Sequence, residues 1–488
     1  MMDMAAPPPS EDHDCGWKAR AIDLEDDLAK MRERLASFEE KMAAMERRFL
    51  GKKSEKIAPV AADVRKVRPK DPAEIQATRK ANAELRATKA ETKDEHHRVP
   101  AASKKCPKCC STKFRAVGQG KISYVLDYVP GYFRRTRHIR EVLACECAAH
   151  VVTAPGPDYS IEGTSYGDGL RAWVVTSKCA DSIPVYRQSK QLSRLGIPIG
   201  RSTLNDLLHQ TAKSLAPLST RLLKLIAASD LVLADETSLL MQEPNKRGFV
   251  WAFLADKMIA YKFAASRSGD TPASVLGGTT GTLLVDMYTG YNRVTGTGKR
   301  TRAACLAHAR RKFFDAKETG HTDALDDINF IRDVYVVEHD ARERGICGTH
   351  AHRVLRATRS KVIMDRLADW LREKKDAYPP KSPMGRAISY ATKNWTELTE
   401  FLNDPKIPPD NNRSESALRV IALGRKNFLF VGDEANGEEL AGLYSLVSTC
   451  AINGVDPLAY LTDVLRRIGS HPASELDNLL PHIWRPTD

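Results

Sequence analysis

The apolar pattern between residues 230 and 292 restricts the fold more than any other feature of this sequence. Three strand-like runs follow one another with short polar breaks, and they read DLVLADETSLL, RGFVWAFLAD and MIAYKFAAS. A short helical segment, TPASVLGG, comes next, and GTLLVDMYTGYN then supplies a further strand. Runs of this length that are rich in β-branched and aromatic residues are typical of strands, and the DK between the second and third runs predicts a hairpin. We therefore expect three antiparallel strands, a helix and a fourth strand.

This order is typical of a ribonuclease-H-like sheet, in which the first and fourth strands lie side by side. Asp235 follows the apolar part of the first strand, and Asp286 follows the apolar part of the fourth. The two carboxylates are then expected to meet at adjacent strand ends. Because like charges repel unless a cation lies between them, the arrangement predicts Mg²⁺ or Mn²⁺ at this place.

A third carboxylate, Glu415, stands in the segment PPDNNRSESALRVIALGRKN (408–427). Apolar residues mark one buried face of this predicted helix, and cations surround the glutamate: Arg419, Arg425 and Lys426. Glu415 either pairs with Arg419 one turn away or belongs to a site for metal and polyanion together. A helical pair of this kind contributes about 0.2–0.5 kcal/mol, too little to explain the charge pattern. We favour a two-metal phosphoryl-transfer site, with ions roughly 3.5–4 Å apart, whose flanking cations bind the DNA backbone.

The charge of the chain is concentrated in one window. The 488 residues carry a net charge of +13, and residues 51–140 alone hold 23 Lys and Arg against 9 Asp and Glu. A basic segment on a nearly neutral body indicates an anionic partner, most often nucleic acid, although a solvated linker is the simpler alternative. The length predicts three or more domains.

An apolar stripe near the N-terminus has heptad spacing. Its steps of four and three predict a coiled coil over residues 17–50, and self-association is the favoured interpretation over a hairpin onto the rest of the chain. The stripe consists of Trp17, Ala21, Leu24, Leu28, Met31, Leu35, Phe38, Met42, Met45 and Phe49.

Cysteines in the basic region have the spacing of a zinc site. Cys106 and Cys109 form a CxxC pair before a β-rich stretch, and Cys145, Cys147 or His150 could complete a tetrahedral Zn²⁺ site. The alternative is reduced structural cysteine in a ribbon without metal. Cations alternate with aromatic residues before the second pair, as in a strand that faces phosphates; these cations are Arg134, Arg135, Arg137 and Arg140.

The segment between residues 181 and 210 has a helix-turn-helix outline. We expect a helix that ends near Leu195, a turn at Gly196, and a second helix capped by Ser202, with Arg201 at its start. This segment either contacts DNA or is an ordinary helical hairpin.

The whole chain is thus expected to be a multidomain α+β protein. Its parts are a disordered start (1–16), the coiled coil (17–50), a basic linker (51–100), a zinc-ribbon-like DNA-binding domain (101–158), a helix-turn-helix-like helical domain (159–227), a catalytic core in two parts (228–315 and 406–450) around a helical insertion (316–405), and a helical C-terminal domain (451–488).

Taken together, these motifs resemble the DDE-type transposases of bacterial insertion sequences, specifically the IS66 family. The resemblance runs from the heptads to the C-terminus, and it is carried by FLGKKSEK, LDYVPGYF, ADSIPVYRQSKQLSRLGIPIGRSTL, ADET, VDMYTGYN, CLAHARRKFFDA, DNNRSESALR and YSLVSTCAINGVDPLAYLTDVL in the order of that family.

The resemblance implies a metal-binding triad of Asp235, Asp286 and Glu415, cleavage at the terminal inverted repeats of the element, and joining of the 3′-OH to target DNA. His308, in the C-x-x-H element that begins at Cys305, could reach the scissile phosphate. Its basic neighbours flank the same helix: Arg310, Arg311 and Lys312. The expected partners are DNA, further copies of the chain and small accessory proteins of the same element.

The sequence departs from the family pattern at a few places, with CxC at the second zinc pair, Leu306 instead of Trp, Ser416 instead of Arg and Ala451 instead of Lys. A catalytically inactive DNA-binding relative is the alternative function, and a structure-specific nuclease is a third. No apolar run reaches the length of a membrane span and no signal peptide core is present, so we expect a cytoplasmic bacterial protein that joins the nucleoid when bound to DNA.

Overall fold

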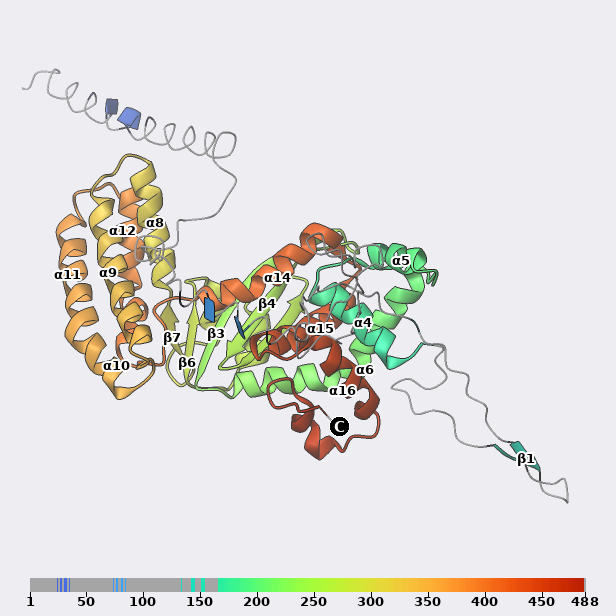
Figure 1. Cartoon of the computed structure of the whole chain (residues 1–488). Coiled ribbons are helices and arrows are strands. Elements are labelled where there is room, and N and C mark those ends of the chain that lie inside the picture. Colours follow the sequence, from blue (N-terminus) through green and yellow to red (C-terminus); the bar gives the residue numbers. More distant parts are fainter. Residues whose placement is uncertain are drawn as a thin grey trace, which may run out of the picture. The chain divides into compact units, whose positions relative to one another are not determined.

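The structure is a computed structural model that describes residues 166–486, the strands β1 (Val142–Ala144) and β2 (Val151–Thr153), and scattered positions between 24 and 133. The chain divides into two compact units. Residues 56–157 form one unit, and residues 1–55 together with 158–488 form the other (Figure 1).

A mixed sheet lies at the centre of the larger unit. Its strands are β3 (Leu231–Met241), β4 (Lys246–Ala255), β5 (Met258–Ala264), β6 (Thr282–Val285) and β7 (Thr301–Ala304), and their order is β5-β4-β3-β6-β7. The first three strands pair antiparallel, whereas β6 pairs parallel with both β3 and β7. A short strand, β8 (Phe430–Val431), pairs parallel with the end of β3. The predicted adjacency of the first and fourth strands is confirmed by the pairing of β3 with β6.

Helices precede, interrupt and follow this sheet. Before it come α4 (Asp168–Cys179), α5 (Val185–Arg194) and α6 (Arg201–Ala227), and within it α7 (Asp270–Leu276) and the 3₁₀ turn η2 (Thr289–Arg293). After β7 come α8 (Leu306–Glu318), α9 (Ala324–Glu343), α10 (His350–Leu355), the π-helical η3 (Arg356–Ser360), α11 (Lys361–Lys374), α12 (Pro383–Lys393), α13 (Trp395–Thr399) and η4 (Glu400–Leu402). The chain then forms α14 (Asn412–Phe428), α15 (Glu434–Ile452), α16 (Pro457–Ile468) and η5 (Ala473–Leu479).

The described residues of the expected helical insertion, 316–405, are helical. In Figure 1, α8 to α12 form a bundle drawn in yellow and orange, and contacts of α13 and η4 with β7 join the end of this bundle to the sheet. The segment then enters α14 and so returns to the sheet, which α14 covers at β3 and β4.

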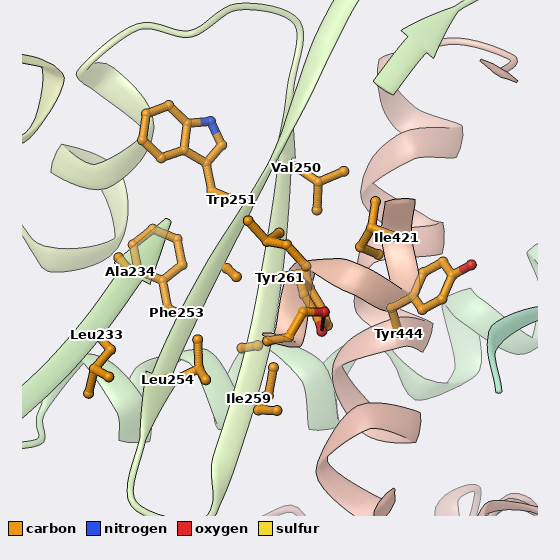
Figure 2. Close-up of a cluster of buried hydrophobic side chains, with 14 of the residues drawn as sticks. Leu233, Ala234, Val250, Trp251, Phe253, Leu254, Ile259, Tyr261, Ile421 and Tyr444 are labelled. Carbon is orange, nitrogen blue, oxygen red and sulfur yellow. Dashed lines mark hydrogen bonds between the residues drawn. The ribbon is translucent and has the colours of Figure 1, made fainter. Parts of the chain in front are cut away.

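A hydrophobic core fixes α14 and α15 against the sheet. Figure 2 shows Ile421 of α14 and Tyr444 of α15 on the same side of Tyr261 in β5. All three side chains are buried, and the Tyr261 hydroxyl donates a hydrogen bond of 2.8 Å to the backbone oxygen of Ala417. Burying side chains of this size contributes about 1.5–3 kcal/mol each, so the core holds the start of α14 in a fixed place above the sheet.

The helix-turn-helix outline forms, with one correction to its cap. The turn contains Gly196 at a φ of +78°, which a residue with a Cβ rarely adopts. Gly200 is the N-cap of α6, and Ser202 lies inside the helix, so the prediction that Ser202 caps it is wrong. The reason is that Arg201 already has helical geometry. The helix therefore begins one residue before the position at which the cap was expected. Arg201 itself is exposed at the first position of α6.

Four residues of the predicted N-terminal stripe are described, namely Leu24, Leu28, Met31 and Leu35. They are helical and 47–63% exposed, as an apolar stripe without a covering partner would be. Across the described residues, no helix combines the length and apolar character that crossing a membrane requires.

Candidate active site

The register of β3 and β6 brings the first two predicted carboxylates together. Leu233 pairs with Leu284, and the same register continued by two residues sets Asp235 of β3 opposite Asp286, which follows β6 directly. Neighbouring strands lie about 4.8 Å apart, so both side chains leave the sheet at one place. Asp235 Oδ1 accepts the N–H of Glu236 at 2.9 Å, and Asp286 Oδ1 accepts the N–H of Tyr288 at 2.9 Å.

The third carboxylate arrives on the first turn of α14, and Asn411 attaches this turn to the sheet. Asn411 Nδ2 donates to the backbone oxygen of Ala234 at 2.7 Å, beside Asp235. The Oδ1 atom of Asn411 accepts the hydroxyl of Ser414 at 2.7 Å, and its backbone oxygen accepts the N–H of Glu415 at 3.2 Å. One buried amide therefore connects the strand that carries Asp235 with the turn that carries Glu415.

The electrostatics of the cluster indicate that all three carboxylates are close neighbours. Burial, as the largest cause, and the negative charges of Glu236, Asp286 and Glu415 together raise the pKa of Asp235 to about 7. The hydrogen bond from the Glu236 N–H opposes this rise. Such a partly buried, mutually repelling set of hard oxygen donors has the chemistry that binds Mg²⁺ or Mn²⁺.

No ready-made metal site is present among the described residues: no three His, Cys, Asp or Glu side chains there are grouped so that they could hold an ion. The donor types of Asp235, Asp286 and Glu415 nevertheless fit divalent ions.

His308 and Cys305 have different roles at the start of α8. Cys305 is fully buried at the N-cap, its Sγ accepts the N–H of Asn411 at 3.2 Å, and burial raises its pKa to about 12, so its thiol packs rather than reacts. His308 lies one turn further, where burial lowers its pKa against the opposing effects of Glu415 and Asp286. Its Nδ1 is buried and has no hydrogen-bond partner among the described residues. His308 is therefore close enough to Glu415 and Asp286 for their charges to act on its imidazole.

Two residues that the sequence reasoning missed support the cluster. Glu236, whose side chain is 1% exposed, accepts hydrogen bonds of 2.7 Å from the Tyr291 hydroxyl and from Arg267 Nε. Arg302 Nη2 donates to the backbone oxygens of Asp286 at 2.6 Å and Tyr288 at 2.8 Å, which fixes the chain at Asp286. Of these two residues, only Glu236 could have been found from the sequence, because it is acidic and follows Asp235 directly.

The predicted DNA-contacting cations of α14 separate into two groups. Arg419 and Lys426 are exposed and follow Glu415 at spacings of four and eleven residues, so they lie on the same face of the helix as the carboxylate. Arg425 points elsewhere, because its Nη1 donates to Thr237 Oγ1 at 2.9 Å and to the Ser238 oxygen at 2.7 Å.

On α8, Arg311 and Lys312 are exposed, and the Lys312 ammonium stands 4.7 Å from the centre of the Tyr390 ring. Arg310 is partly buried. The predicted zinc ligands and the basic strand residues lie outside the described residues; these are Cys106, Cys109, Cys145, Cys147, His150, Arg134, Arg135, Arg137 and Arg140. In the sequence, the second cysteine pair falls between β1 and β2, which pair antiparallel.

Comparison with known proteins places this site in a family. Residues 163–439 match the family described as "Transposase IS66 family", residues 445–482 match "IS66 C-terminal element", and residues 103–147 match "zinc-finger binding domain of transposase IS66". Two similar relatives from Sinorhizobium fredii (strain NBRC 101917 / NGR234) are both called uncharacterized proteins. Protein y4jD is 34% identical over 400 residues, which cover 77% of this chain and 78% of the relative. Protein y4qI is 32% identical over 400 residues, which cover 78% and 74%.

The match to the transposase family contains the sheet, the carboxylate cluster and the helical bundle, and the zinc-finger match contains both cysteine pairs. A transposase acts on nucleic acid, and the zinc-finger match implies DNA as the partner. Because the transposase match alone covers more than half of the sequence, this chain belongs to the IS66 transposase family.

Proposed function

We propose that the chain is a DDE-type transposase that cleaves DNA at the ends of its element and joins the freed 3′-OH to target DNA. The observation that supports the proposal is the register that sets Asp235 opposite Asp286 at adjacent strand ends, together with the hydrogen bonds of Asn411 that tie Ala234 to the turn of α14 carrying Glu415. The strand order β5-β4-β3-β6-β7 supports a ribonuclease-H-like core, because it puts the two aspartates on adjacent parallel strands.

Asp235, Asp286 and Glu415 would hold two Mg²⁺ or Mn²⁺ ions. Bound there, the ions would activate the attacking oxygen and neutralise charge on the oxygens of an in-line displacement. The raised pKa of Asp235 supports this role, since a carboxylate that repels its neighbours gains most from a cation.

The other residues of the site bind and orient the DNA strand. The imidazole of His308 can donate a hydrogen bond from its N–H to an oxygen of the scissile phosphate, and burial, which lowers its pKa, favours the neutral ring. Arg419, on the same face of α14 as Glu415, can bind a neighbouring phosphate and so help to position the DNA strand. Asn411 and Arg302 act through other residues by fixing the backbone beside Asp235 and at Asp286.

The N-terminal region supplies recognition and assembly in this proposal. The zinc-finger match spans residues 103–147, which supports Cys106, Cys109, Cys145 and Cys147 as the Zn²⁺ ligands and leaves His150 outside. The exposed stripe at Leu24, Leu28, Met31 and Leu35 supports a homo-oligomer formed through a coiled coil. Sedimentation of the full chain tests this, because a monomer at micromolar concentration contradicts it.

The test is a cleavage and joining assay. The substrate is labelled DNA that carries the terminal sequence flanking the chain's own gene, with Mg²⁺ present, and the wild type is compared with Asp235→Asn and Glu415→Gln. We expect both variants to keep DNA binding and to lose at least about 10³-fold in cleavage rate, because each removes a carboxylate that would hold the metal ions. Glu397→Gln, a carboxylate near β7 and outside the cluster, is the matched control and should cut normally.

The other outcomes separate the alternatives. Cleavage that survives both substitutions contradicts the proposed chemistry. Binding of the ends by the wild type without cleavage or joining supports a catalytically inactive DNA-binding relative. Cleavage of branched DNA without regard to end sequence supports a structure-specific nuclease.

A further inference from the structure

The helix α5 has a one-sided distribution of charge that the expected helix-turn-helix contact at Arg201 does not use. Its buried residues are Val185, Gln188 and Leu192. On the opposite face lie three exposed cations with spacings of three and four residues, Arg187, Lys190 and Arg194, which we call the α5 basic face. At 100° per residue these three side chains fall within about 60° of one another.

Within the part of the chain that the structure describes, the α5 basic face has no acidic partner. No Asp or Glu occurs between Asp181 and Asp206 in the sequence. The ion pairs formed among the described residues include none of the three cations. By contrast, two exposed cations of α11 pair along their own helix, Lys361 with Asp365 and Arg372 with Asp369. An uncompensated cationic face of this kind fits a polyanion.

A hydrogen bond connects the α5 basic face to α14, the helix that carries Glu415. Arg187 Nη1 donates to Asn427 Oδ1 at 3.2 Å, and its Nε donates to the hydroxyl of Tyr186 at 3.0 Å. Both acceptors are neutral, so the guanidinium keeps its full charge while its position is fixed. Figure 1 shows the C-terminal end of α14 beside α5.

Exposed cations continue along α14 from the carboxylate cluster to this contact. Arg419 and Lys426 lie on the Glu415 face of α14, whereas Arg425 turns toward β3. Asn427 is twelve residues beyond Glu415 on the same helix (427 − 415). At a rise of 1.5 Å per residue this is about 18 Å, the length of about five base pairs of duplex.

We propose that the α5 basic face binds the phosphate backbone of the DNA duplex about five base pairs from the position of strand cleavage. The inference rests on the proposed function, since it takes the carboxylate cluster as the place of cleavage. The duplex runs along the Glu415 face of α14, with Arg419 and Lys426 beside it, and reaches α5 where Arg187 meets Asn427.

The first experiment measures the salt dependence of DNA binding without divalent ions, so that it is independent of cleavage. The probe is a fluorescent 40-base-pair duplex with the terminal sequence of the chain's own element. The full-length variant Arg187→Gln/Lys190→Gln/Arg194→Gln is compared with Arg353→Gln/Arg366→Gln/Lys375→Gln, which removes the same charge from exposed positions of the helical insertion. Equal thermal unfolding of both variants and the wild type verifies their folding.

We expect the α5 variant to lower the slope of log K against log salt by about 2.7, which is 0.9 for each of three phosphate contacts. The control variant should leave the slope unchanged. Equal slopes for the wild type and the α5 variant, or equal losses in both variants, overturn the inference and leave the face to an acidic protein partner. A wild type that cuts DNA while the α5 variant keeps its slope would refute this inference and leave the proposed function intact.

The second experiment locates the contact. Single neutral methylphosphonates are placed at successive positions of the probe. The wild type should lose affinity when they stand about five base pairs from the cut, and the α5 variant should be insensitive there. The same sensitivity in both proteins contradicts the contact.

Discussion

At the scale of single residues, neighbours in the sequence have unequal roles that burial decides. Asn411 and Asn412 are adjacent and chemically identical, yet Asn411 is 1% exposed and bonded to Ala234 and Ser414, whereas Asn412 is exposed. The same contrast holds for Asp326 and Asp327 at the start of α9, where only Asp327 is buried. The position of each side chain relative to the core, and not its type, sets what a substitution does.

Asn411→Ala should lower the free energy of unfolding by about 1–3 kcal/mol, because it leaves the buried oxygen of Ala234 and the Ser414 hydroxyl without partners. It should also slow cleavage by loosening the turn that holds Glu415. Asn412→Ala is the matched control and should change stability by less than about 0.5 kcal/mol. Urea denaturation measures both, and an equal effect of the two substitutions would show that the Asn411 amide does not join β3 to α14.

Asp327→Asn should stabilise the protein increasingly as the pH rises. Neither carboxyl oxygen of Asp327 accepts a hydrogen bond from a described residue, and burial raises its pKa well above the ordinary value of 3.8. Because the pKa of Asp327 is higher in the folded state than in the unfolded state, the group contributes its full stabilisation below pH 3.8. This stabilisation is lost as the pH rises toward the pKa of the folded state. The gain from the asparagine should therefore grow by up to about 1.4 kcal/mol per pH unit.

Urea denaturation at several values between pH 5 and pH 8 tests this, with Asp326→Asn on the exposed side of α9 as the control. Parallel pH profiles of the wild type and Asp327→Asn would contradict the burial of an unpartnered carboxyl group.

At the scale of secondary-structure elements, α14 combines two functions on two faces. Its inner face packs on the sheet through Ile421 and through the bonds of Arg425 to β3, and its outer face carries Glu415, Arg419 and Lys426. Apolar packing thus holds the helix on the sheet, while Arg419 and Lys426 stay exposed on the face that carries Glu415. This division answers why one acidic residue stands among so many basic ones in a helix beside the core.

Arg425→Ala should cost about 1–3 kcal/mol of stability, because Thr237 and Ser238 lose a charged hydrogen-bond donor. Arg419→Ala should leave stability within about 0.5 kcal/mol and weaken DNA binding instead. Chemical denaturation and a binding titration separate the two effects. If Arg425→Ala weakens binding without lowering stability, the assignment of Arg425 to the core contact is wrong.

At the scale of the whole molecule, the predicted zinc ligands and the predicted catalytic carboxylates fall in different units. Residues 56–157 contain all the predicted zinc ligands, and residues 158–488 contain the sheet and the carboxylate cluster. A small zinc domain obtains much of its folding free energy from the metal, whereas the large unit has its own hydrophobic core.

Cys106→Ser should therefore reduce bound zinc from about one ion per chain to nearly none, without a shift in the main thermal unfolding transition. Elemental analysis and calorimetry of the full chain measure the two quantities. Gly454→Ser, which changes a turn in the larger unit, is a control that should keep its zinc. Wild-type protein without zinc after purification free of chelators, or a lowered main transition in Cys106→Ser, contradicts this separation.

Much of the arrangement followed from local patterns. The apolar runs predict the order of the strands and hence Asp235 beside Asp286, and the pairing of β3 with β6 agrees with this. The spacing of apolar residues in 408–427 predicted a helix with a buried face, and α14 has both. These features are predictable because strand and helix periods depend on residues near one another in the chain.

The rest depended on contacts between distant residues. The sequence by itself determined the carboxylates, the cysteine pairs and the excess of positive charge. Tertiary structure alone decided that Arg425 faces β3, that Asn411 and not Asn412 holds Glu415 near Asp235, and that Arg187 meets Asn427 across 240 residues. The physical reason is that burial and hydrogen bonding depend on what packs against a side chain, and the packing partner comes from elsewhere in the chain.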